Sequence, residues 1–366
     1  MTATMEALAF VSSLLCLIYV TVAGAIHRGL SRTAAGRNAE LHDVTVVIPA
    51  RNEAHRIEAC LAALAEQTYP PERTDVIVVD DRSTDDTARR ALAWTDRIPG
   101  LRVARDTEPA LACPKKNALD AGIRVGAGEI ILTTDADCIP SPDWIASTVR
   151  AFDTDVGMVA GYAPLSAGKR LLSGLLALQG LVVSTLAAGS MGLGFPLTCS
   201  GRNLAYRRAA FHDAGGFGPI GHIHGGDDVL LMRRIAKRTP WRIRFNPEAR
   251  VDSQPHTDGL FRRQVRYQSK AVHYGYSVLL VAACIYIFHV ALAAGPFLAW
   301  QHPVFRVPFG LMVAAKFLAD WLLLLRAARR FSARKILRLF PLLELISVPY
   351  VVVICAAGAL APSRWK

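Results

Sequence analysis

The sequence lacks the glycine-rich loops with which many nucleotide-binding folds hold phosphates. Neither GxGxxG nor GxxxxGK[S/T] follows any of its strand-like runs, so a dinucleotide-binding fold and a P-loop NTPase are poorly supported. Its seven cysteines are scattered, with no CxxC and no Cys/His spacing. This pattern argues against structural zinc, and the odd number favours a reducing compartment over a disulfide framework.

Long runs with few charges, by contrast, are abundant. Hydrophobic residues make up 52% of the 366 residues, and the mean hydropathy is +0.27. Four runs are long enough to cross a bilayer: Met5–Ile26, Ser277–Trp300, Phe305–Leu325 and Phe340–Ala361. Because the third contains Lys316 and Asp320 and the fourth contains Glu344, we expect these two to pack against protein on one side.

Basic residues follow the first run instead of preceding it. Ala23–Ala25 resembles a signal-peptidase site, but the amino end MTATME has no basic residue, which favours a signal anchor over a cleaved signal peptide. Arg28, Arg32 and Arg37 come just after the run, and Arg326–Arg338 separates the third and fourth runs. The positive-inside rule places both basic segments in the cytoplasm. We therefore expect a multi-pass protein of the cell (inner) membrane with a cytoplasmic soluble domain.

The net charge of +12 would suit a nucleic-acid partner. Much of the excess, however, falls in the juxtamembrane runs, where Lys and Arg meet anionic lipid. We therefore expect a membrane surface as the partner of this charge, and no nucleic acid.

Strand-like and helix-like segments alternate between the first two apolar runs. The strand-like runs are Val44–Ala50, Asp75–Asp81, Leu101–Arg105, Glu129–Asp135 and Val156–Tyr162. Helical spacing between them, as in Ile57, Leu61 and Leu64, predicts an α/β domain with a mostly parallel sheet and helices on both faces. In such sheets ligands bind beyond the carboxyl ends of the strands.

Acidic residues follow three of these strand ends, in the motifs PARNE, DDRSTDD and TTDADC. Each aspartate alone could cap a helix, which is our interpretation of Asp85 and Asp86. Asp135 and Asp137, one residue apart, could instead hold a divalent cation and through it a nucleotide. Carboxylates suit a hard cation and thiolates do not, so Cys138 is expected to take no part.

Taken in order, these motifs resemble the family 2 glycosyltransferases, inverting enzymes with the GT-A fold. From about Val44 to Lys270, VVIPARNEAHRIEACLAAL is similar to the opening strand and helix, and VIVVDDRSTDDT to the second strand. PKKNALDAGIRVGAGEIILTTDADC resembles the lysine-to-DxD block, SGRNLAYRRAAFHDAGGF the acceptor-side loop, and GGDDVLLMRRI the later acidic pair. The resemblance implies a Rossmann-like GT-A domain over 40–270, and the apolar runs predict a transmembrane anchor over 1–27 and about three transmembrane helices over 271–366.

The resemblance also implies roles for the matched residues. The nucleotide sugar would be contacted by Pro49, Ala50, Asn52, Glu53, Asp80, Asp81, Lys115 and Asp135. Among them Asp80 would lie at the base and Lys115 near the uracil side, while Lys116 is interpreted as solvated. Asp137 would bind Mg²⁺ or Mn²⁺, with Asp135 on the ribose or on the metal through water. A hard cation stabilises the charge that a departing nucleoside diphosphate leaves on its phosphate oxygens.

Asp228, with Asp227 before it, aligns with the acidic pair that contains the family's catalytic base. Inversion requires deprotonation of the acceptor hydroxyl on the sugar face opposite the leaving group. The alternative interpretation is that both aspartates cap the amphipathic helix DVLLMRRIAKR. His222 and His224, just upstream, are rival acceptor contacts.

Arg263, Arg266 and Tyr267 stand where processive members of the family carry the Gln, Arg and Trp of QxxRW. Arg266 can pair with phosphate and Tyr267 keeps an aromatic face, so these residues are expected at the acceptor and the diphosphate. The missing Gln and Trp, together with only four membrane segments, argue against a polysaccharide synthase.

The stretch Leu171–Leu197 is nearly free of charge. A single membrane crossing here would separate the DxD motif from Asp228, so we reject it. We interpret the stretch as an amphipathic or hairpin segment in the membrane interface, near the entrance for a lipid acceptor, or as a buried core helix.

These features together predict a membrane-anchored, metal-dependent, inverting hexosyltransferase. It would move a sugar from a nucleotide-diphosphate donor, UDP-linked, to a lipid hydroxyl or phosphate at the cytoplasmic face. The architecture resembles bacterial enzymes that glycosylate ceramide-like, hopanoid, carotenoid or polyprenyl acceptors. A processive synthase is one alternative. A non-catalytic sugar-nucleotide-binding membrane protein is another, and the intact acidic motifs argue against it.

Overall fold

The computed structural model describes residues 2–105, 110–269 and 274–360. The chain divides into two compact units. The helix unit contains Met1–Arg28, Ala167–Leu181 and His256–Lys366, and the sheet unit contains Gly29–Ser166 and Val182–Pro255. The predicted domain boundary at residues 270 and 271 lies outside the described residues.

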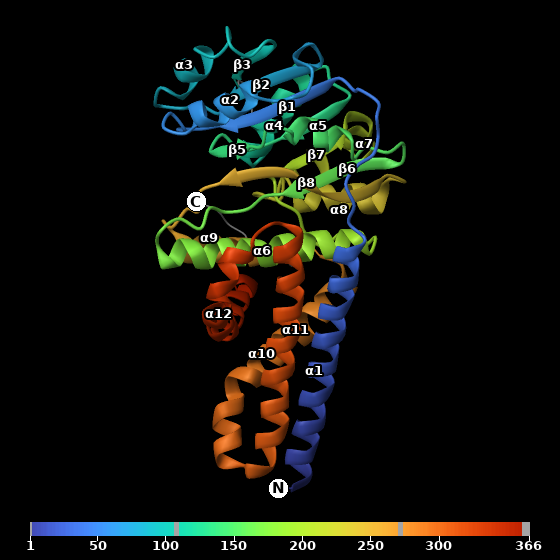
Figure 1. The fold of residues 1–366 in the computed structure, drawn as a ribbon, viewed down its shortest axis with the longest axis vertical. Coiled ribbons are helices and arrows are strands. Elements are labelled where there is room, and N and C mark those ends of the chain that lie inside the picture. The colour runs from blue at the N-terminus through green and yellow to red at the C-terminus, as the bar shows by residue number, and fades with distance from the viewer. Residues whose placement is uncertain (1, 106–109, 270–273, 361–366) are drawn as a thin grey trace. The chain divides into compact units, whose positions relative to one another are not determined.

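The sheet unit is built around a mixed, mostly parallel sheet (Figure 1). The strands among the described residues are β1 Val44–Ala50, β2 Thr74–Asp80, β3 Leu101–Arg105, β4 Ile130–Thr133, β5 Cys138–Pro140, β6 Val156–Tyr162, β7 Leu204–Arg207 and β8 Arg242–Ser253. Their order is β3-β2-β1-β4-β7-β6-β8-β5. Only β7, between β4 and β6, and β5, beside β8, run antiparallel to their neighbours. The predicted fold class is confirmed, and β1, β2, β3, β4 and β6 are the strands that the sequence predicted.

The helices that the structure describes are α1 Thr2–Ser31, α2 Ile57–Ala65, α3 Thr87–Leu92, α4 Pro114–Val125, α5 Trp144–Val149, α6 Leu171–Gly192, α7 Arg208–Asp213, α8 Val229–Arg238, α9 Leu260–Ser269, α10 Tyr276–Gln301, α11 Arg306–Arg330 and α12 Phe340–Leu360. All seven cysteines are free thiols.

Different helices cover the two faces of the sheet. Alternate residues of β1, beginning with Val44, pack with Leu61 of α2 and Trp144 of α5 in one core. Val47 faces the other way, where it lies against Gly122 of α4. Because helices cover both faces of β1, its sequence is a mostly continuous apolar run and does not alternate between apolar and polar residues.

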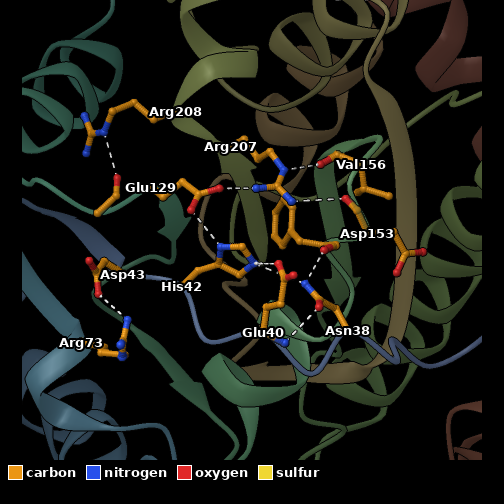
Figure 2. Close-up of polar contacts among 12 residues, drawn as sticks. Asn38, Glu40, His42, Asp43, Arg73, Glu129, Asp153, Val156, Arg207 and Arg208 are labelled. Carbon is orange, nitrogen blue, oxygen red and sulfur yellow. Dashed lines mark hydrogen bonds and ion pairs between the residues drawn. The ribbon is translucent and has the colours of Figure 1, made fainter.

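A polar cluster holds the amino ends of β1 and β4 (Figure 2). Glu129, directly before β4, accepts a hydrogen bond from Arg207 of β7 and lies 2.8 Å from Nδ1 of His42, which precedes β1. The Arg208 guanidinium donates to three backbone carbonyls between the end of α4 and β4. These contacts fix the edge of the sheet opposite the acidic strand ends.

Within the described residues, five helices are long and apolar enough to cross a membrane. Four correspond to the predicted runs, and the fifth is α6. Because α6 is one continuous helix of 22 residues, the predicted hairpin is wrong. Half of its most apolar stretch is buried within the protein, against 11 to 22% for the other four, which sets α6 apart from the predicted crossings.

Charged residues in the apolar helices of the helix unit pair with one another. Lys316 of α11, only 3% exposed, donates to Asp320 at 2.9 Å, to Glu344 of α12 at 2.5 Å and to the Ser347 hydroxyl at 3.1 Å. The Tyr19 hydroxyl of α1 donates to Asp320 at 2.7 Å. The prediction that these helices pack against protein is confirmed, and the cluster ties α1 to α11 and α12.

A second polar group in the helix unit joins α6, α9 and α12. Gln179 donates to the Tyr350 hydroxyl at 2.7 Å, Tyr350 donates to Gln264 at 2.8 Å, and Gln264 donates back to Gln179 at 3.2 Å. Each side chain both donates and accepts, so the three form a closed ring that fixes α9.

Candidate active site

The DxD motif lies in the turn between β4 and β5. Asp135, Asp137 and Cys138 present ligand atoms within 4.8 Å of one another. Cys138 is fully buried and donates to Asp137 at 3.6 Å. Burial, followed by the nearby carboxylates, raises the pKa of Cys138 to about 12, so it stays a thiol at neutral pH. The remaining donors are two carboxylates, a set that fits Mg²⁺ or Mn²⁺ better than a soft metal.

Lys115, the second residue of α4, connects this turn to the later acidic pair. Its ammonium lies 2.5 Å from Asp135 Oδ1 and 3.4 Å from Asp227 Oδ2. Burial lowers the pKa of Lys115, but Asp135, Asp227 and Asp228 outweigh burial and raise this pKa well above its usual value. Lys115 is therefore positively charged at neutral pH, in contact with both acidic motifs.

Asp228 occupies the N-cap of α8, as the capping interpretation predicted. Its Oδ1 accepts from the backbone N–H of Val229 at 2.7 Å, and its Oδ2 accepts from that of Gly201 at 3.3 Å. A Cβ on Gly201 would lie 3.1 Å from Asp227 Oδ2 and 3.5 Å from Lys115 Nζ. Gly201 therefore closes the cluster with its backbone, a role that sequence reasoning missed although the residue lies in the quoted acceptor-side motif.

The carboxylate of Asp80, the last residue of β2, is 1% exposed. Its Oδ1 accepts from the backbone N–H of Ser83 at 3.1 Å. Its Oδ2 is buried and accepts no hydrogen bond from any residue that the structure describes, and Arg105 Nε lies 3.4 Å away. A buried acceptor without a donor is costly, and a bound molecule with an N–H or O–H group would satisfy it.

Asp81, by contrast, is engaged within the protein. Its Oδ1 accepts from the Arg82 guanidinium at 2.8 Å, and Arg51 lies 3.8 Å from its Oδ2. Its backbone N–H donates to the carbonyl of Ala50 at 2.8 Å, while Pro49 pairs with β2 one residue earlier. These contacts align the ends of β1 and β2 side by side.

Hydrogen bonds connect the loop after β1 to the loop after β2. Asn52 has a positive φ of 56°, its side-chain oxygen accepts from the Thr84 N–H at 2.8 Å, and its own N–H donates to the Ser83 hydroxyl at 3.0 Å. The N–H of Glu53 donates to the Thr87 hydroxyl at 2.8 Å. The predicted nucleotide-binding residues of both loops therefore belong to one connected edge.

The two aspartates interpreted as caps behave differently. Asp85 accepts from the N–H of Thr87, the first residue of α3, at 3.0 Å, and this interpretation is confirmed. Asp86 stands at the N-cap position but makes no side-chain cap hydrogen bond. It pairs instead with Arg89 at 2.6 Å, so the capping interpretation of Asp86 is wrong.

The interpretation of Lys116 as solvated is also wrong. Lys116 is 0% exposed, and its ammonium donates to the backbone carbonyls of Ile220 and, at 2.8 Å, Ile223. The N–H of Gly225, two residues before Asp227, donates to the Cys113 sulfur at 3.4 Å. The start of α4 thus holds the loop that leads to the acidic pair. His222 is exposed and His224 half-buried in the same loop.

Arg263, Arg266 and Tyr267 lie on α9 in the helix unit. Arg263 donates to the carbonyls of His256 and Asp258 at 2.8 and 3.0 Å, which secures the start of α9. The Arg266 guanidinium stacks over the half-exposed ring of Tyr267 at 5.4 Å. Their predicted contact with acceptor or diphosphate stays a prediction.

Two family models match the sequence. Glycosyl transferase family 2 matches residues 45–214, and Glycosyl transferase family group 2 matches residues 130–360, more than half of the chain. The chain belongs to the family 2 glycosyltransferases.

Curated relatives match this chain over only part of their own length. The chain is 28% identical over 230 residues to the probable glycosyltransferase YdaM of Bacillus subtilis, covering 62% of this chain and 54% of YdaM. It is 34% identical over 119 residues to the glycosyltransferase AglE of Haloferax volcanii, covering 32% of this chain and 38% of AglE. The chain thus spans about half or less of the length of these relatives.

The mannosyltransferase PcManGT from Pyrobaculum calidifontis, solved in complex with GDP-Man and Mn²⁺, has a similar structure. The TM-score is 0.66 at 23% sequence identity, and the match covers 97% of this chain and 98% of that one. At this identity the likeness shows the fold, an α/β GT-A-like domain accompanied by apolar helices.

Proposed function

We propose that this glycosyltransferase binds its nucleotide sugar across the carboxyl ends of β1, β2 and β4 and transfers the sugar with inversion, with Asp228 as the base. The observation that carries the proposal is the position of Lys115. Its ammonium contacts Asp135 of the DxD turn and Asp227 of the acidic pair, so one cation joins the donor-side and acceptor-side carboxylates in a single cluster.

The donor side has separate groups for the base and for the diphosphate. Asp80 Oδ2, buried and 3.4 Å from Arg105, is suited to accept from an N–H of the base or an O–H of the ribose. Asp137 and Asp135 would hold a divalent cation, which supplies positive charge for the departing diphosphate. Lys115 adds a second positive charge on the same side.

The acceptor side requires a carboxylate that takes a proton. In our proposal Asp228 accepts the proton of the acceptor hydroxyl, whose oxygen forms the new bond to the anomeric carbon. The bond from that carbon to the diphosphate oxygen breaks on the opposite face, and the electron pair leaves with the diphosphate. The backbone N–H groups of Gly201 and Val229 orient the carboxylate for this transfer.

We further propose a membrane-lipid acceptor at the cytoplasmic face, in a multi-pass protein of the inner membrane. The four helices α1, α10, α11 and α12, each long and apolar enough to cross a membrane, and the arginines after α1 support this arrangement. In it, 1–27 and 271–366 lie in the membrane, 40–270 form the catalytic domain, and α9 with Arg263, Arg266 and Tyr267 serves the acceptor and the diphosphate.

A donor-by-acceptor screen tests the proposal. Membranes containing the protein are incubated with labelled UDP- and GDP-linked sugars and a lipid extract. Both nucleosides are included because the similar mannosyltransferase was solved with GDP-Man. We expect a labelled lipid carrying a single sugar, with the opposite anomeric configuration by NMR. A long polysaccharide product would favour the processive alternative.

Variants of the two acidic motifs test the mechanism in the same assay. Removal of a general base costs about 10²–10⁴-fold in rate, so Asp228→Asn should lose at least about 100-fold, and Asp137→Ala should abolish metal-dependent transfer. Asp96→Asn, on an exposed site between α3 and β3, is the matched control and should retain full activity. Activity that survives both Asp137→Ala and Asp228→Asn, or that is indifferent to EDTA, contradicts the proposal.

A further inference from the structure

A cavity of about 380 Å³ lies in the sheet unit at the edge opposite the acidic strand ends. Its walls come from the residues that follow α1, from the end of α6, and from the first residues of β8. β8 runs parallel to β6 and in the same direction as β4, so the cavity lies at amino ends of strands, whereas the DxD turn follows a carboxyl end. The cavity is therefore separate from the candidate active site.

The charged lining of the cavity is mostly basic. Arg244 is 17% exposed and pairs with Asp153 at 2.8 Å (Asp153 is labelled in Figure 2), and Arg242 pairs with Asp155 at 2.8 Å. Arg32 is exposed and forms no ion pair with any residue that the structure describes. One arginine of the cavity thus remains available for an external anion.

Apolar side chains stand beside this charge. Met191 and Phe245 form a buried wall, at 5% and 3% exposure. Leu193, also in the lining, is 37% exposed, and the neighbouring Phe195 is 54% exposed. A ligand that fits both features has an anionic group and an apolar part.

The backbone around the cavity is held tightly. A Cβ on Gly29 of α1 would lie 1.9 Å from the Gly189 carbonyl of α6, and one on Gly192 would lie 2.0 Å from the Gly29 carbonyl. The ends of the two helices therefore touch backbone to backbone, which only glycine permits. Arg244 also donates to the carbonyl of Ala35 at 2.9 Å. The cavity is preorganised, which lowers the entropic cost of binding.

The chain places Arg32 at the depth of lipid headgroups if α1 crosses the membrane. The apolar span of α1 ends at Ser31, directly before Arg32, and a helix rises about 1.5 Å per residue. Basic side chains at this position meet the phosphates of the cytoplasmic leaflet. This step rests on the membrane arrangement of the proposed function.

We propose that this cavity binds the headgroup phosphate of an anionic membrane phospholipid, as a site distinct from that of the acceptor. Arg32 pairs with the phosphate, and Leu193 and Phe195 lie against the glycerol backbone and upper acyl chains. Bound there, the lipid sets the height of the sheet unit at the membrane surface.

Lipid binding by the full-length protein tests the site. Protein in nanodiscs containing phosphatidylglycerol and phosphatidylcholine is extracted with its bound lipid and analysed by native mass spectrometry. One basic residue near a lipid surface contributes about fivefold in affinity, so Arg32→Gln should lower phosphatidylglycerol retention about fivefold, and Arg32→Lys should restore most of it. Arg37→Gln removes the same charge from an exposed site outside the cavity and should leave retention unchanged.

Each alternative outcome overturns the inference. Equal losses for Arg32→Gln and Arg37→Gln would mean diffuse attraction to the membrane without a site. Displacement of the lipid by millimolar inorganic phosphate would mean a site for soluble anions. The assay contains no sugar nucleotide, so its failure is distinguishable from failure of the proposed transfer reaction. Thermal unfolding of each variant, expected to match wild type, shows that the exposed substitution leaves the fold intact.

Discussion

Replacing Lys116 by methionine tests whether a buried amine positions the loop that leads to Asp228. Methionine keeps the length and the apolar stem of lysine and removes the ammonium. The carbonyls of Ile220 and Ile223, which now accept from Lys116, would lose their donor inside the protein. The change therefore removes the two hydrogen bonds of one ammonium and leaves Lys115, which faces the acidic cluster, in place.

The expected loss of folding free energy in Lys116→Met is the difference between two opposing contributions. Each unpaired buried carbonyl costs about 1–3 kcal/mol, while removing a buried ammonium recovers part of its desolvation penalty. We expect a net destabilisation of about 2–3 kcal/mol, or a fall in Tm of about 5–10 °C for a domain of this size. Lys237→Met, at an exposed site on the last turn of α8, is the control and should leave Tm unchanged.

The assay separates positioning from general loss of structure. Donor affinity is measured by calorimetry with the nucleoside diphosphate, and kcat in the transfer assay, both well below the lower Tm. Since Asp80 ends β2 and Asp137 lies in the turn between β4 and β5, both away from this loop, donor Kd should stay near the wild-type value. A displacement of about 1 Å at a catalytic group costs about 10²-fold in rate, so kcat should fall by about 10- to 100-fold. Wild-type Tm and kcat in Lys116→Met would refute the reasoning.

Three further predictions address other parts of the molecule. Gly201→Ala places a Cβ 3.1 Å from a carboxylate of the acidic cluster and should lower kcat about tenfold, or about 1.4 kcal/mol, with Tm unchanged; a wild-type rate would contradict the close packing. Lys316→Met removes the buried cation that pairs with the half-buried carboxylates of Asp320 and Glu344 and should cost about 3–5 kcal/mol, seen as a lower Tm in detergent. Adding Glu344→Gln should recover part of that loss, and strictly additive losses would contradict the pairing. A hydrogen bond from Arg242 lowers the pKa of Asp155, so its stabilising contribution is present above the unfolded pKa of about 3.9 and disappears as the pH falls through the lower folded value. Asp155→Asn should therefore flatten the acid limb of the stability curve measured by urea unfolding, and an unchanged slope would contradict the ion pair.

The local sequence pattern was sufficient to predict the parallel strands β1, β2, β3, β4 and β6. It did not predict β5, β7 and β8. The β1, β2 and β6 runs are apolar and β-branched because they are buried on both faces, and such runs are visible in the sequence. β8 was not predicted, although exposed or half-exposed positions such as Arg242, Arg244 and Glu248 recur at even numbers and alternate with mostly buried ones. That period-two pattern was a usable signal. β5 and β7 have only three and four residues, too few for periodicity to be detected, and unlike the equally short β4 neither forms an apolar β-branched run.

Lys115 and Lys116 are an example of contacts that the local sequence pattern cannot predict. The two lysines are chemically identical and adjacent, so local pattern does not separate them, and only the resemblance to the family assigned Lys115 to the site. On α4 each residue is turned by about 100° from the previous one. One ammonium therefore reaches Asp135 and Asp227, while the other points into the protein toward Ile220 and Ile223. Which lysine serves the site depended on how α4 docks against a loop about 100 residues later in the chain.

Asp86 and Asp228 also have similar local sequence positions but different contacts in the structure. Both precede a helix and both carry the residue type that caps one, yet only Asp228 makes the capping hydrogen bond. Arg89 lies one turn further along the helix from Asp86. The Asp86 carboxylate forms an ion pair with Arg89 and does not accept a hydrogen bond from the helix backbone.

Composition and spacing alone determined the apolar helices, the α/β class and the acidic strand ends, and the resemblance of the ordered motifs indicated the family. These depend on solvent transfer and on periodicities of two and 3.6, which act within a few residues. The joining of the DxD turn to the acidic pair through Lys115, the closure of that cluster by Gly201, and the cavity beside Arg32 appear only when distant segments meet. Packing decides such contacts, because a side chain's partner is set by the docking of whole elements and not by its neighbours in the chain.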